Sequence, residues 1–201
     1  MKTFLELREA ANKGLTIFDI DDTLFRTKAK VLVRKVGDGG KPKHLSPRQF
    51  NSYKLGKDEY FDYGEFKSSK LFYQTATPIG KMVKKAKAII RNAVAKGSKV
   101  IIVTARSDMD DKNLFIKTFE MHGIPMDNVH VYRAGNSGGS SGKAKQVIFK
   151  QFLDTGEFGR IRLFDDDTGN LKALLDLQSI YPDVEMFAYL ADAKGSVKRI
   201  K

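Results

Sequence analysis

Short β-branched segments alternate with amphipathic helical patterns along most of this chain. Short runs of this composition are typical of the strands of a buried parallel sheet. They are Leu15–Ile20, Lys99–Thr104, Asn128–Tyr132, Arg160–Phe164 and Val184–Leu190. The helical patterns are Pro78–Lys96, Asp108–His122, Lys143–Leu153 and Thr168–Leu177. This alternation requires right-handed crossovers and predicts an α/β fold, a Rossmann-like parallel sheet with helices on both faces.

Residues 21–98 interrupt the alternation, because they are too many for one crossover between the first and second strands. Lys30–Lys35 and Lys43–Leu45 predict a β-hairpin around a glycine-rich tip. Ser46–Pro47 is typical of a helix start, and Asp58–Tyr73 is rich in aromatic residues. We therefore predict an α/β core with a small cap inserted between its first two strands, the core being residues 1–25 and 76–201 and the cap residues 26–75.

Carboxylates gather directly after two of the predicted strands. Asp19, Asp21 and Asp22 follow the first strand, and Asp165–Asp167 follow the fourth. Ligands of open α/β sheets bind beyond the carboxyl ends of the strands, so the two groups meet if these strands are neighbours. Clustered carboxylates repel one another unless a cation lies among them, and Mg²⁺ prefers oxygen ligands. Asp-rich turns or helix caps are the alternative explanation.

These residues resemble, in order, the four motifs of the haloacid dehalogenase superfamily. The first is Asp19-x-Asp21-x-Thr23 after an apolar strand, and the second is Thr104 after Val100–Val103. A lysine opening the late helix is the third, and Asp165-Asp166 is the fourth. The resemblance spans Leu15 to about Asn170 and implies a phosphatase with the HAD-like fold.

The resemblance also implies a role for each residue. Asp19 would be the nucleophile that forms an aspartyl-phosphate, and Asp21 the general acid and base. Thr104 and the lysine would hold phosphoryl oxygens, with Thr23 as a further substrate-binding candidate. Mg²⁺ would bind Asp19, the backbone carbonyl of Asp21 and an acid of the fourth motif.

Two lysines compete for the third motif, and the fourth motif departs from its usual form. Lys145 lies one turn before a buried apolar stripe, which favours it over Lys143; either could instead be an ordinary solvated lysine. The fourth motif has Asn170 where most family members have a further Asp. We expect Asp166 to bind the metal with Asp165 in support, and Asp167 to be a turn or cap residue ahead of the helix that starts at Thr168.

Arg106 lies two residues after Thr104, beside the expected phosphate site. It would clamp a phosphate in a bidentate manner, or else form a salt bridge with Asp108 or Asp110. An arginine here and a double Asp in the fourth motif are similar to the phosphatase module of polynucleotide kinase-phosphatases. The phosphate-binding loop of the kinase module is absent from this sequence.

Positive charge is concentrated in the predicted cap. The chain carries a net charge of +12, and ten basic residues lie between Arg26 and Lys57 against one acid, Asp38. This concentration of basic residues favours a surface that attracts anions toward the expected site, and the alternative is a hairpin whose basic side chains are simply solvated. The aromatic residues that follow would stack on bases or form the cap's own core: Tyr60, Phe61, Tyr63 and Phe66.

Together these patterns predict a Mg²⁺-dependent phosphomonoesterase acting on a nucleotide or nucleic-acid terminal phosphate. The alternatives are a small-metabolite phosphatase of the same superfamily and a catalytically idle nucleic-acid-binding protein. The absence of cysteine excludes thiol catalysis and disulfides. No apolar run reaches the roughly 20 residues of a spanning helix, so we expect a cytoplasmic protein that binds a phosphorylated anion and no membrane.

Overall fold

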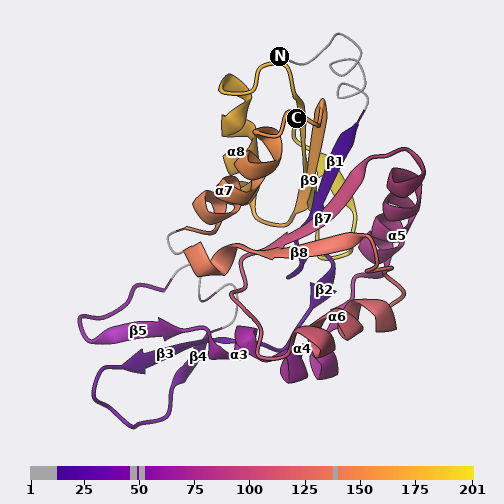
Figure 1. The fold of residues 1–201 in the computed structure, drawn as a ribbon. Coiled ribbons are helices and arrows are strands. Elements are labelled where there is room, and N and C mark those ends of the chain that lie inside the picture. The colour runs from indigo at the N-terminus through magenta and orange to yellow at the C-terminus, as the bar shows by residue number, and fades with distance from the viewer. Residues whose placement is uncertain (1–12, 46–48, 50–52, 138–139) are drawn as a thin grey trace.

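In a computed structural model of the chain, which describes residues 13–45, 49, 53–137 and 140–201, a six-stranded sheet forms the centre (Figure 1). The strand order is β11-β10-β9-β1-β7-β8, and β11 alone in this sheet runs antiparallel to its neighbour. The strands are β1 (Gly14–Phe18), β7 (Lys99–Thr104), β8 (Val129–Arg133), β9 (Arg160–Asp165), β10 (Glu185–Ala191) and β11 (Val197–Arg199). The predicted α/β class with a mostly parallel sheet is therefore confirmed.

Helices cover both faces of this sheet. One face packs against α5 (Gly80–Ala95) and α6 (Lys112–Met121), and the other against α7 (Ser141–Leu153) and α8 (Thr168–Leu175). Alternate residues of β1 enter the two cores, Phe18 on the α5 side and Ile17 on the α7 side, as the period of two of a strand requires. None of the helices in the described ranges is long and apolar enough to cross a membrane.

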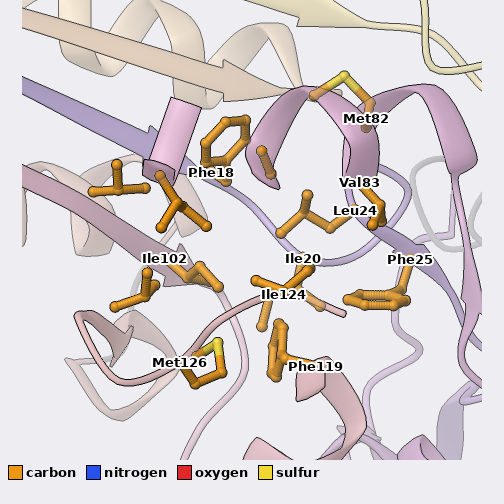
Figure 2. Close-up of a cluster of buried hydrophobic side chains, with 14 of the residues drawn as sticks. Phe18, Ile20, Leu24, Phe25, Met82, Val83, Ile102, Phe119, Ile124 and Met126 are labelled. Carbon is orange, nitrogen blue, oxygen red and sulfur yellow. The ribbon is translucent and has the colours of Figure 1, made fainter. Parts of the chain in front are cut away.

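The larger core cluster lies directly beneath the loop that follows β1. Figure 2 shows Ile20, Leu24 and Phe25 from this loop packed with Phe119 of α6 and with Met82 of α5. Ile20, Phe25, Phe119 and Met82 are fully buried, and Leu24 is only 1% exposed. The apolar residues that alternate with the acids after β1 thus anchor the loop and hold its polar side chains at the sheet edge.

The predicted element boundaries shift where side chains cap or bend the backbone. β1 ends at Phe18 rather than Ile20, because the chain turns and Leu24 and Phe25 both donate backbone hydrogen bonds to Ile20 O. α6 begins at Lys112 rather than Asp108, with Asp111 as the N-cap that accepts from Leu114 N at 2.9 Å. α8 ends at Leu175 and continues as the 3₁₀ helix η2 (Asp176–Ser179).

The part of the chain between β1 and α5, residues 25–78, folds beyond the carboxyl ends of the strands (Figure 1). β2 (Phe25–Arg26) pairs with β6 (Thr77–Pro78) at its base. The predicted hairpin is confirmed as β3 (Val31–Lys35) and β4 (Lys43–Leu45), and β5 (Glu59–Asp62) adds to the other edge of β3. The aromatic region continues as α3 (Gly64–Lys67) and α4 (Ser69–Thr75). The helix start predicted at Ser46–Pro47 lies outside the described residues.

Candidate active site

The acids after β1 and β9 meet at one edge of the sheet, as expected for neighbouring strands. β1 pairs in parallel with both β7 and β9, so Asp19, Thr104 and Asp165 lie at adjacent strand ends. Asp19 N donates to Phe164 O at 3.0 Å, which extends the pairing to the first acid. Asp19, Thr104 and Asp165 are buried. The sheet topology thereby assembles residues far apart in the sequence into one polar cluster inside an apolar frame.

Lys145 of α7 holds two of these carboxylates. Its Nζ lies 2.6 Å from Asp19 Oδ1 and 2.8 Å from Asp165 Oδ2, and the lysine is completely buried. The apolar stripe of α7, including Ile148 and Phe149, fixes the helix so that Lys145 points into the cluster. Lys143, the alternative candidate, is exposed. The structure therefore brings Lys145 to the acids and leaves Lys143 at the surface.

Burial and charge act together on this ion-paired cluster. Burial raises the pKa of Asp19 well above its usual value; Lys145 opposes the rise, and the carboxylates of Asp165, Asp166 and Asp21 add to it. Burial alone would lower the pKa of Lys145, but Asp19 and Asp165 outweigh it and raise that pKa. One ammonium thus faces several carboxylates, so a further cation would favour ionised Asp19.

Asp165 is saturated with hydrogen bonds from the protein. Besides Lys145, it accepts from the backbone N–H of Asp167 at 2.9 Å and from Asn170 Nδ2 at 3.0 and 3.1 Å to its two oxygens. Asn170 is itself buried, and its Oδ1 has no hydrogen-bond partner among the described residues. Asp165 therefore orients Lys145 and Asn170, while the free amide oxygen of Asn170 can accept a hydrogen bond from a water or ligand.

Asp166 presents the most accessible carboxylate of the cluster. It is exposed, and its Oδ1 accepts from Thr23 Oγ1 at 3.3 Å. The surrounding residues partly desolvate this carboxylate, and this desolvation, together with the negative charges of Asp165 and Asp22, raises the pKa of Asp166 to about 7. Asp19, Asp165 and Asp166 each offer an oxygen within 4.8 Å of the others, which is a donor set suited to a hard divalent cation.

Arg106 pairs with Asp21, a partner that sequence reasoning did not identify. Its Nε donates to Asp21 Oδ2 at 2.8 Å and its Nη2 to Oδ1 at 2.7 Å, in the bidentate geometry specific to arginine. The salt-bridge alternative for Arg106 named Asp108 and Asp110, and both have other partners. Asp108 accepts from Arg133 at 2.8 Å, and Asp110 accepts from Ser69 N at 2.7 Å.

The guanidinium of Arg106 is enclosed by residues from the 26–75 segment. Its centre lies 5.0 Å from the Phe66 ring and 4.7 Å from the Phe72 ring, which favours a cation held between aromatic faces. Nη1 donates to Phe66 O at 3.1 Å and Nη2 to Thr27 Oγ1 at 3.4 Å. Protein acceptors thereby engage four of the five N–H groups of Arg106. In this structure Arg106 therefore binds Asp21, and one N–H group remains for a phosphate.

A tight loop sets the position of Asp21 from the other side. Asp22 has φ of 57°, a left-handed conformation that Asp tolerates better than most residues, and its N–H donates to Phe25 O at 2.8 Å. Burial, with repulsion from Asp21, raises the pKa of Asp22. The turn projects Asp21 toward Arg106 while its apolar neighbours remain in the core.

Two glycines allow the site-bearing elements to approach closely. A Cβ on Gly135 would lie 2.3 Å from Ala105 O and 2.7 Å from Arg106 C, so this position supports the loop that carries Arg106. A Cβ on Gly142 would lie 3.1 Å from Gly169 O, where the first turns of α7 and α8 meet. Asp167 caps α8 by accepting from Gly169 N at 2.6 Å, as predicted.

The remaining sequence-predicted residue, Thr104, is the buried last residue of β7. Its Oγ1 accepts from Arg106 N at 3.1 Å, and this bond leaves the hydroxyl proton for another acceptor. No protein-family model matches this chain, and neither does any curated protein sequence. The site combines a buried carboxylate held by Lys145, a second carboxylate held by Arg106, and three carboxylates that could hold a cation.

Proposed function

We propose that the protein is a Mg²⁺-dependent phosphomonoesterase of the haloacid dehalogenase type, which acts through an aspartyl-phosphate on Asp19. The observation that carries the proposal is the pairing of two carboxylates with two different cations. Asp19 is fixed by Lys145 at 2.6 Å, and Asp21, two residues on, is fixed separately by Arg106. This arrangement gives one acid the role of nucleophile and the other that of proton carrier.

In the first step, a carboxylate oxygen of Asp19 attacks phosphorus and the bond to the leaving oxygen breaks. Lys145 donates to Asp19 Oδ1, which sets the plane of the carboxylate and offers positive charge to the phosphoryl oxygens. For this step Asp21 is protonated and one of its oxygens releases its hydrogen bond from Arg106; that oxygen gives its proton to the leaving oxygen, so that an alcohol departs. In the second step, Asp21 takes a proton from the water that attacks phosphorus, and Asp19 is regenerated as inorganic phosphate leaves.

The donor set fits Mg²⁺. Asp19 and Asp166 would hold the ion together with the backbone carbonyl of Asp21, and the bound ion would reduce repulsion between the Asp19 carboxylate and an anionic phosphate. Two observations support this fit: the raised pKa of Asp19, and the unpartnered Oδ1 of buried Asn170. Asp165, whose oxygens are used by Lys145, Asn170 and Asp167, would support the site from behind.

We further propose that the substrate is a nucleotide or a nucleic-acid end. The support is the position of the basic 26–75 segment, whose strands and α3 lie beyond the carboxyl ends of β1 and β7 (Figure 1). Arg106 joins this segment to the site through Phe66 and Thr27. A cap of this charge would attract phosphorylated anions toward Asp19.

Hydrolysis of p-nitrophenyl phosphate with and without Mg²⁺ tests the mechanism. Asp19→Asn, which keeps the shape of the side chain but not its nucleophilicity, should abolish turnover, and EDTA should do the same to the unaltered protein. Full activity of Asp19→Asn would disprove the covalent mechanism. A parallel screen of phosphorylated oligonucleotides, nucleotides and sugar phosphates tests the substrate: equal rates on sugar phosphates would contradict a nucleic-acid preference.

A further inference from the structure

A groove with a volume of about 610 Å³ lies between the β4–β3–β5 sheet and the α3–α4 segment. Lys28, Lys30, Leu32, Arg34 and His44 line its sheet side, and Glu65 lies on the helical side. The lining residues at 28, 30, 32 and 34 follow one another at intervals of two, so they project from one face of the extended chain. The groove is therefore a cationic row with an apolar position, Leu32, in its middle.

The strand register extends this face across the small sheet. Leu32 lies opposite both His44 and Asp62, and Arg34 lies opposite Tyr60. Residues opposite one another in an antiparallel pair point to the same side of the sheet. The aromatic ring of Tyr60, which is 45% exposed, therefore stands beside Arg34 on the face that forms the groove.

The acids of the groove are engaged within its walls. Asp62 accepts from Arg34 at 2.6 Å, and Glu65 accepts from the backbone N–H of Lys30 at 2.7 Å. No ion pair involves the ammonium groups of Lys28 and Lys30 within the described residues. These two cations thus remain for an anion, while Arg34 and Asp62 keep the wall in place.

The groove adjoins the candidate active site. Thr27, which precedes Lys28, accepts a hydrogen bond from Arg106 at 3.4 Å. A single extended stretch of chain thus faces Arg106 through Thr27 and the groove through Lys28 and Lys30.

We propose that this groove holds the sugar-phosphate backbone of a single-stranded nucleic acid whose terminal phosphate reaches Asp19. The proposal rests on the proposed function and names the part of the molecule that would select its substrate. Lys28 and Lys30 contact successive phosphates as point charges, and Tyr60 offers a face on which a base stacks. A short phosphorylated compound would occupy Asp19 without reaching these residues.

Binding of a fluorescently labelled, unphosphorylated 12-nucleotide DNA strand over a range of salt concentrations tests the groove. The double variant Lys28→Gln/Lys30→Gln should bind the strand about tenfold more weakly. The slope of the logarithm of the binding constant against the logarithm of the salt concentration should become smaller in magnitude by about 1.4, the value for two lost single-strand phosphate contacts. The control, Lys84→Gln/Lys96→Gln, removes two exposed lysines on and just after α5 and the same charge, and should bind as the unaltered protein does. Equal losses in both variants, or none in the groove variant, would overturn the proposal.

Kinetic measurements separate this proposal from the proposed function. The groove variant should show a raised KM for a 3′- or 5′-phosphorylated 12-nucleotide strand and unchanged hydrolysis of p-nitrophenyl phosphate. If the unaltered protein hydrolyses no phosphomonoester but still binds the strand through Lys28 and Lys30, the proposed function fails and the groove stands. Displacement of the strand by polyglutamate as readily as by unlabelled DNA would overturn the assignment to nucleic acid.

Discussion

The guanidinium of Arg106 binds both carboxylate oxygens of Asp21, at 2.8 and 2.7 Å, across a separation of 85 residues. Arg106 is 3% exposed, and its side chain also contacts Phe66, Phe72 and Thr27. The proposed proton carrier is therefore oriented by an arginine that is itself fixed by the segment between β1 and β7. The Asp21 side chain is thus held in one orientation by this pair as well as by the turn at Asp22.

Arg106→Lys should impair proton transfer more than it impairs attack on phosphorus, because a lysine cannot reproduce the bidentate pair. Hydrolysis of an alkyl phosphate, whose leaving oxygen needs a proton, should fall by about two orders of magnitude. Hydrolysis of p-nitrophenyl phosphate should fall much less, since p-nitrophenolate leaves without one. Asp21→Asn serves as the reference for this pattern, and an equal loss on both substrates would contradict a positioning role.

Lys145→Met should destabilise the protein by about 3–5 kcal/mol, because it leaves the buried Asp19 and Asp165 without their shared cation. Lys143→Met, two residues away and exposed, should change the unfolding free energy little. Urea unfolding of both variants measures the difference. If the two substitutions cost the same, the ion-paired cluster does not form as described.

Asp166→Asn should remove most of the stabilisation that Mg²⁺ gives to the protein. A ligand at one hundred times its Kd stabilises the folded state by about 2.7 kcal/mol, so Mg²⁺ should raise the midpoint of thermal unfolding. The neighbouring variant Asp167→Asn should respond to Mg²⁺ as the unaltered protein does, because Asp167 caps α8 and Asn also caps helices. An undiminished Mg²⁺ response in Asp166→Asn would show that the ion binds elsewhere.

Features set by local periodicity could be predicted from the sequence. The β-branched runs predicted the five main strands of the sheet. The apolar stripe of α7 favoured Lys145 over Lys143 as the lysine of the site, because helix geometry fixes which residues face inward. The meeting of Asp19 with Asp165 followed from parallel strands sharing one edge. The three-residue strand β11 was missed, since it is too short for its period to stand out.

Features set by distant contacts could not be predicted in the same way. The partner of Arg106 depends on where Phe66 and Phe72 lie, and these come from helices of four and seven residues whose positions no local pattern fixes. The saturation of Asp165 likewise depends on Asn170, whose donation to both carboxylate oxygens follows from the packing of α8 and not from the motif. The Oδ1 of Asn170 has no partner among the described residues and remains available to a water or ligand.

Acid should weaken the attachment of α4 to the loop after β7. Hydrogen bonds from the backbone and side chain of Ser69 lower the pKa of Asp110, so the unfolded chain binds this proton first as the pH falls. The stabilisation is present above the ordinary carboxyl pKa, about 4, and is lost below it as the pH falls through the lower folded value. Asp110→Asn should reduce the slope of unfolding free energy against pH in this range, and an unchanged slope would contradict it.

Gly135→Ala should lower both stability and activity, although this glycine contacts no catalytic side chain in the proposed mechanism. Its Cβ would lie 2.3 Å from Ala105 O and 2.7 Å from Ser107 N, which forces the loop carrying Arg106 to move. Overpacking of this kind costs about 1–3 kcal/mol, and the shift would misplace the partner of Asp21. Gly80→Ala is the matched control: a Cβ there meets nothing within 4 Å, and alanine favours the start of α5, so stability should rise slightly. Urea unfolding and alkyl phosphate hydrolysis measure both variants, and normal activity of Gly135→Ala would show that Asp21 does not depend on the position of this loop.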